Sequence, residues 1–190
     1  MTTKTEIIAK GFKTLRAGMI SEAKVIISEN YPFKSMKKEG RTYREHQKMK
    51  IFLRDGFTDR YSGERLVFPP VLRIMSSLMP EEFPFHRNWK TSDCHLAYWH
   101  LMPTIDHIIP ISRGGPDEES NWVCTSQLRN SAKSSWLLEE LGWQLHKAGD
   151  LKDWDGLLAS FMEYIAVNPG ALADGYINSW YVAAKRANGK

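Results

Sequence analysis

The chain has 190 residues, of which 42% are hydrophobic and 12% aromatic, enough apolar surface for a packed core. This composition excludes a mainly disordered or low-complexity protein, and no run approaches the roughly 18 apolar residues of a membrane span. Two cysteines are too few for a disulfide framework or a four-thiolate zinc site. The N-terminus lacks the pattern of a signal peptide. We therefore expect one domain over residues 1–190, in the cytoplasm.

The first 50 residues are expected to form helices and to carry a basic segment. Apolar residues at helical spacing predict a helix over 3–29, ended by Tyr31-Pro32, and a second helix over about 41–54. Residues 34–50 hold seven Lys or Arg against two Glu, and the net charge of +4 permits a polyanionic partner. Either this segment contacts phosphates or it is a solvated face. The candidate contacts are Lys37, Lys38, Arg41 and Arg44.

The central residues predict a strand, a loop, a second strand and a helix. Residues 57–103 contain many prolines and indicate irregular structure, with short strands near 61–67. Strands are expected over 104–111 and 122–125, separated by turn residues at 112–117. Ser126 is placed to cap the helix that follows. Three further helices are expected over 136–146, 154–166 and 171–187, so the fold class is α+β.

Four residues in this central unit have side chains suited to phosphodiester hydrolysis: Asp106, His107, Asn121 and Asn130. The reaction needs a base that activates water and a divalent cation that stabilises the leaving oxygen. A neutral imidazole such as that of His107 is a base at physiological pH. The Asp106 carboxylate and the Asn130 amide offer oxygen ligands of the kind that Mg²⁺ or Mn²⁺ prefers.

The same stretch resembles the HNH endonucleases, a family with a ββα-metal fold. The matching residues are Asp106-His107-Ile108-x-Pro110, Gly114-Gly115, Asn121-Trp122 and Asn130-x-x-Lys133. The resemblance implies that His107 is the general base and that Asp106 and Asn130 bind the metal ion. It also implies that Asn121 braces the loop that orients His107. The HNH core is then expected over residues 51–141, with residues 142–190 as C-terminal helices.

One departure from the family concerns four cysteines that bind a structural zinc ion in many members. The corresponding positions here are Asp59, Ser62, Ser126 and Arg129, so we expect no structural zinc. Asp59 and Arg129 lie in opposite halves of that lost site and carry opposite charges. We therefore predict a salt bridge between them, with an apolar clamp through Phe57, Tyr61 and Leu128 as the alternative.

The function expected from these residues is metal-dependent cleavage of DNA, most simply of a duplex. Arg113 and Lys133 are further candidate phosphate contacts. Cleavage of RNA or of single strands, and a nucleic-acid-binding module with a vestigial site, stay open as alternatives. The residues also leave open whether the chain nicks one strand or acts on both with a second copy or a partner protein.

Overall fold

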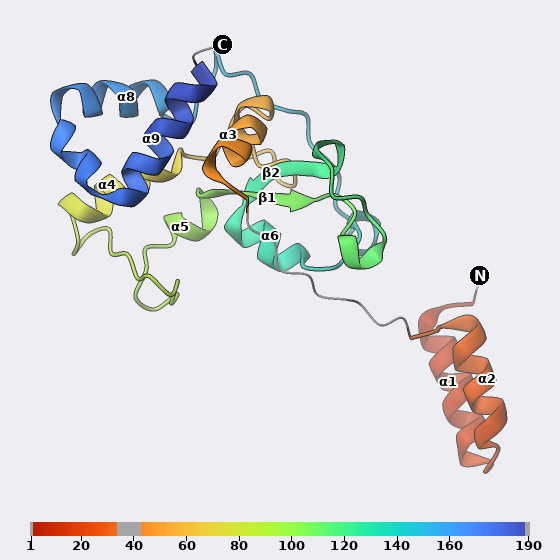
Figure 1. Cartoon of the computed structure of the whole chain (residues 1–190). Helices are drawn as coiled ribbons and strands as arrows, with labels where there is room; N and C mark the ends of the chain where they lie inside the picture. The colour runs from red at the N-terminus through yellow and green to blue at the C-terminus, as the bar shows by residue number, and fades with distance from the viewer. Residues whose placement is uncertain (1, 34–42, 189–190) are drawn as a thin grey trace. The chain divides into compact units, whose positions relative to one another are not determined.

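The computed structural model describes residues 2–33 and 43–188 (Figure 1). The chain divides into two compact units, residues 1–38 and 39–190. That these units make up one domain remains a prediction. No helix within the described ranges is long and apolar enough to cross a bilayer.

The first unit is a pair of helices, α1 (Lys4–Arg16) and α2 (Ile20–Asn30). The hydroxyl of Thr3 accepts a hydrogen bond from the Glu6 backbone N–H, and the Glu6 carboxylate accepts one from that of Thr3, which caps α1. The single helix expected over 3–29 is wrong, because the chain turns at Gly18. This glycine has a φ of +80°, a left-handed conformation that ends a helix.

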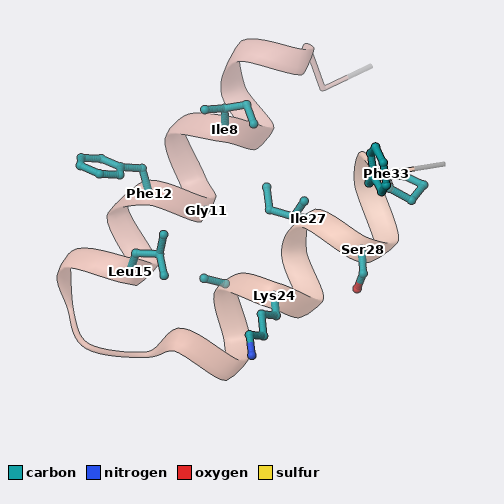
Figure 2. A pocket seen from close by; sticks show the side chains of 10 residues that line it. Ile8, Gly11, Phe12, Leu15, Lys24, Ile27, Ser28 and Phe33 are labelled. Carbon is teal, nitrogen blue, oxygen red and sulfur yellow. The ribbon is translucent and has the colours of Figure 1, made fainter. Parts of the chain in front are cut away.

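The helix pair has little core of its own. Figure 2 shows Ile27 of α2 pointing toward α1, where its Cδ1 atom lies near Gly11. Gly11 and Ala23 are the residues that these two helices bury. Phe12 of α1 keeps 63% of its surface exposed and Phe33 keeps 91%. Both line an open groove of about 640 Å³.

The second unit is built around a two-stranded antiparallel sheet of β1 (Pro103–His107) and β2 (Trp122–Ser126). Asp106 pairs with Val123 in the register, and His107 with Trp122. Helix α6 (Gln127–Lys133) follows β2 directly, and the hydroxyl of Ser126 caps it by accepting from the backbone N–H of Arg129 at 3.2 Å. The strands lie between α6 and α3 (Glu45–Arg54) (Figure 1). The predicted α+β fold class is confirmed.

The C-terminal helices share the hydrophobic core of the sheet. They are α7 (Leu138–Leu141), α8 (Leu158–Val167) and α9 (Gly175–Asn188), of which α7 is shorter than predicted. Trp180 of α9 stacks on Phe52 of α3 with 5.9 Å between ring centroids. Phe68 packs edge-on against both Trp180 and Phe161 of α8. Residues that precede β1 and residues that follow β2 in the sequence therefore form one hydrophobic core with the sheet.

Residues 57–103 contain more helix than their prolines suggested. Helix α4 (Pro69–Leu78) begins with Pro69 and Pro70, and α5 (Ala97–His100) follows later. Proline fits the first turn of a helix because the N–H that it lacks has no partner there. The strands expected near 61–67 are reduced to one bridge between Thr58 and Arg65. Short 3-10 helices cover Ile111–Arg113, Glu119–Asn121 and Pro169–Ala173.

Candidate active site

The carboxylate of Asp106, in β1, is held by two groups on one of its oxygens. Its Oδ2 atom accepts a hydrogen bond from the Tyr61 hydroxyl at 2.8 Å and lies 2.9 Å from the Lys133 ammonium. Burial, followed by the nearby charge of Asp106, raises the pKa of Tyr61 well above its ordinary value. The phenol therefore stays protonated and donates to the carboxylate.

Lys133 lies inside the protein, with no exposed side-chain area. Its ammonium also donates to the backbone carbonyl of His107 at 2.6 Å and lies 5.6 Å from the centre of the Tyr61 ring. The prediction that Lys133 contacts phosphate is therefore corrected. The ammonium pairs with the Asp106 carboxylate, donates to the His107 carbonyl and is not exposed to solvent.

Asn130 lies one helical turn before Lys133 in α6 and faces the same strand. Its side-chain amide N–H approaches the Ile105 carbonyl at 3.5 Å, next to Asp106. No described residue donates to Oδ1 of Asp106 or of Asn130. One carboxylate oxygen and one amide oxygen suit a hard divalent cation, which keeps several waters when a protein offers few ligands. Within residues 2–33 and 43–188, no three His, Cys, Asp or Glu side chains gather as a metal-binding group.

The imidazole of His107 follows Asp106 at the end of β1, and 14% of its side chain is exposed. Its Nε2 atom lies 2.9 Å from the carboxylate of Asp117, in the loop between the strands. The indole N–H of Trp122 lies at 3.0 Å from the same nitrogen, and the Tyr43 hydroxyl at 3.3 Å. Polar groups therefore surround Nε2. Sequence reasoning did not anticipate these three partners.

Asn121 is buried in the same loop, and its side chain forms hydrogen bonds with backbone groups of two other loop residues. Its side-chain oxygen accepts from the N–H of Ile109, and its amide donates to the carbonyls of Ile109 and Pro116, each at 2.9 Å. These contacts hold the chain directly after His107 against the end of the loop. A bracing role for Asn121 stays a prediction, and this geometry supports it.

Residues 92–129 match the family model of the HNH endonucleases. This segment is an HNH endonuclease domain. The match spans β1, the loop and β2, and it includes Asp106, His107 and Asn121. No curated protein and no solved structure matches the chain. HNH nucleases generally use a divalent metal ion and typically act on DNA.

The other candidate phosphate contacts differ in their surroundings. Lys37, Lys38 and Arg41 lie outside the described residues. Arg44 is exposed at the start of α3. The guanidinium of Arg113, in the loop of the HNH domain, is 3.0 Å from the carboxylate of Glu140. A phosphate contact by Arg113 would compete with this ion pair.

Asp59 occupies one of the four positions at which the resemblance places zinc-binding cysteines, and its contacts differ from those predicted. Asp59 is fully buried. Its carboxylate accepts hydrogen bonds from the backbone N–H groups of Tyr61 and Ser126 and from the Thr125 hydroxyl, at 2.8–2.9 Å. The guanidinium of Arg129 instead lies over the Trp143 ring, 5.3 Å from its centre. The predicted Asp59–Arg129 salt bridge is not formed between these described residues, because donors of the turn and of β2 already satisfy the carboxylate.

A second buried carboxylate, Asp55, also joins this turn to β2. It accepts from the backbone N–H of Cys124 at 2.8 Å and pairs with the guanidinium groups of Arg54 and Arg60, each at 2.9 Å. Burial, and then the charges of Asp55 and Asp59, raise the pKa of the Cys124 thiol well above its ordinary value. This thiol therefore stays protonated inside the core. The sequence motif gave no reason to single out Asp55.

Proposed function

We propose that the chain is a metal-dependent endonuclease that hydrolyses phosphodiester bonds in DNA. The observation that supports this proposal is that Asp106, His107 and Asn130 belong to one ββα unit. Asp106 and His107 end β1, and Asn130 reaches the same strand from α6. Their types fit the needs of the reaction, since they supply a base, a carboxylate and an amide oxygen.

In this proposal His107 accepts a proton from the attacking water, and Asp106 and Asn130 hold one divalent cation, Mg²⁺ or Mn²⁺. The ion would supply positive charge beside the leaving oxygen. Tyr61 and Lys133 fix the orientation of the Asp106 carboxylate through Oδ2. The orientation of its other oxygen, Oδ1, is thereby fixed, as a metal ligand requires.

The proposed substrate is double-stranded DNA, which the basic residues Lys37, Lys38, Arg41 and Arg44 would contact through its phosphates. One active site cuts one strand at a time. Cleavage of both strands would therefore need a second copy of the chain, a partner protein or a second encounter.

The test is to incubate the purified protein with supercoiled plasmid and, separately, with labelled RNA, each with Mg²⁺, Mn²⁺ or a chelator. We expect nicked circles with either metal ion and intact supercoils with the chelator. Cleavage of RNA alone would assign the site to RNA. Binding to DNA without cleavage under any metal condition would favour a binding module with a vestigial site.

A further inference from the structure

The polar groups around His107 Nε2 also converge on a single oxygen of Asp117. The Oδ1 atom of Asp117 lies 2.9 Å from Nε2, 3.2 Å from the Trp122 indole nitrogen and 3.2 Å from the Tyr43 hydroxyl. Tyr43 and Trp122 also pack edge to face, with 4.9 Å between their ring centroids. His107 and Asp117 thus sit in one polar cluster whose members come from three parts of the chain.

The chemistry of these groups favours one of the two nitrogens of His107 as the one that carries the proton. A carboxylate only accepts hydrogen bonds, and an indole N–H only donates. An unprotonated Nε2 would place its lone pair against the negative oxygen of Asp117 at 2.9 Å, which is repulsive. The Trp122 indole N–H lies 3.0 Å from Nε2 and 3.2 Å from Oδ1 of Asp117. With Nε2 protonated, Nε2 donates to Asp117, and the Trp122 N–H and the Tyr43 hydroxyl donate to the same carboxylate oxygen. The Nδ1 atom is then the nitrogen with a lone pair.

We propose that Asp117 is a positioning residue that holds His107 in the tautomer with the proton on Nε2. The consequence of this tautomer for catalysis rests on the proposed nuclease function, in which the Nδ1 atom of His107 takes the proton from water. A carboxylate that fixes a histidine tautomer in this way leaves the second nitrogen ready to act as a base.

The direct test reads the tautomer without DNA or metal. Protein with ¹⁵N-labelled histidine is recorded by long-range ¹H–¹⁵N NMR at about pH 9, where an ordinary imidazole is neutral. A spectrum of His107→Ala identifies the His107 signals among those of the six histidines. We expect a protonated Nε2 and a bare Nδ1 in the native protein. Asp117→Asn should shift the population toward the other tautomer, because its amide N–H can donate to Nε2.

The matched control is Glu118→Gln, which removes the same charge from the next residue of the loop, where the side chain is exposed. It should leave the tautomer unchanged. A native His107 with its proton on Nδ1, or an Asp117→Asn spectrum identical to the native one, would overturn the proposal.

Plasmid nicking supplies the second readout. Asp117→Asn should lower turnover by about 10- to 100-fold, as loss of an orienting partner does elsewhere, while the KM for DNA and the thermal transition stay native. Glu118→Gln should nick at the native rate. Native turnover in Asp117→Asn would overturn the proposal. A native protein that has the Nε2–H tautomer but cuts no nucleic acid would instead contradict the proposed nuclease function.

Discussion

Lys133 is a buried cation whose partners belong to the active site. An ammonium without exposed area is tolerated only when its charge and its hydrogen-bond donors are satisfied. Here the Asp106 carboxylate and the His107 carbonyl do so, and the Tyr61 ring lies beside them. The same ion pair therefore fixes α6 against β1 and orients a proposed metal ligand.

Replacing Lys133 by Met tests how much this ion pair stabilises the fold. Loss of one partner leaves the Asp106 carboxylate largely buried without its counter-charge, so we expect a loss of about 3–5 kcal/mol in the free energy of unfolding. Urea denaturation followed by tryptophan fluorescence measures it. Lys50→Met is the control, since Lys50 pairs with Glu119 on the surface and should lose about 0–1 kcal/mol. Equal losses in the two variants would contradict a special role for Lys133.

At the scale of elements, two carboxylates connect the turn at residues 55–63 to β2. Asp55 and Asp59 accept hydrogen bonds from the backbone N–H groups of Cys124 and Ser126, two positions apart in the strand. Buried backbone donors need such partners. The turn and the strand are therefore joined by hydrogen bonds.

Asp59→Ala should destabilise the protein more than the replacement of any single hydrogen-bond partner of Asp59. The change leaves three buried donors unpaired, and we expect a loss of about 3 kcal/mol or more. Thr125→Val removes one hydrogen bond at nearly constant volume and should cost about 1 kcal/mol. Arg129→Ala loses mainly its contact with Trp143, worth about 0.5–1 kcal/mol. If Arg129→Ala cost as much as Asp59→Ala, the abandoned salt bridge would have to be reconsidered.

At the scale of the whole molecule, the HNH segment does not have a core to itself. Its buried residues Ile105, Trp122 and Cys124 belong to the same hydrophobic cluster as Trp180 of α9, which lies far beyond the matched residues. Trp180 stacks on Phe52 and packs against Phe68. Removing a buried tryptophan side chain creates a cavity, so Trp180→Ala should lower the free energy of unfolding by about 3–5 kcal/mol. Val182→Ala, at an exposed position of the same helix, should change it little. A native melting temperature in Trp180→Ala would contradict the shared core.

The basic segment allows a prediction about binding by the whole chain. Neutralising Lys37, Lys38, Arg41 and Arg44 together should weaken binding to every DNA sequence. Each lost phosphate contact should reduce the slope of log K against log salt by about 0.9 on duplex DNA. Binding isotherms of a catalytically inactive background at several salt concentrations measure this slope. An unchanged slope would return the segment to the alternative of a solvated face.

The sequence predicted the part of the molecule whose signals are local. Turn residues and the capping Ser126 located β1, β2 and α6, although β1 ends at His107 and not at residue 111 as predicted. The spacing of Asp106, His107 and Asn130 indicated the candidate site. The partners of the site were not predictable in this way. Tyr43 and Asp117 lie 74 residues apart, and Tyr61 and Asp106 lie 45 apart. Only tertiary packing brings such residues together.

Other differences between prediction and structure arose because one residue type can occur in two structural settings. Pro69 and Pro70 indicated irregular structure, yet they occupy the first turn of α4, where proline is favoured. Asp59 suggested an ion pair with Arg129, yet it accepts hydrogen bonds inside the core. In both cases the sequence identified an important position but not the partner or conformation that explains it.

The central claim is that His107 is the general base and that Asn130 is a metal ligand. The most direct test measures the plasmid-nicking rate of His107→Ala and Asn130→Ala as a function of Mn²⁺ concentration. We expect His107→Ala to stay inactive at every Mn²⁺ concentration while calorimetry shows native Mn²⁺ binding, because the base need not touch the ion. Asn130→Ala should bind Mn²⁺ more weakly and regain part of its activity as the concentration rises. Near-native nicking by His107→Ala, or an Asn130→Ala rate that does not respond to Mn²⁺, would contradict the account.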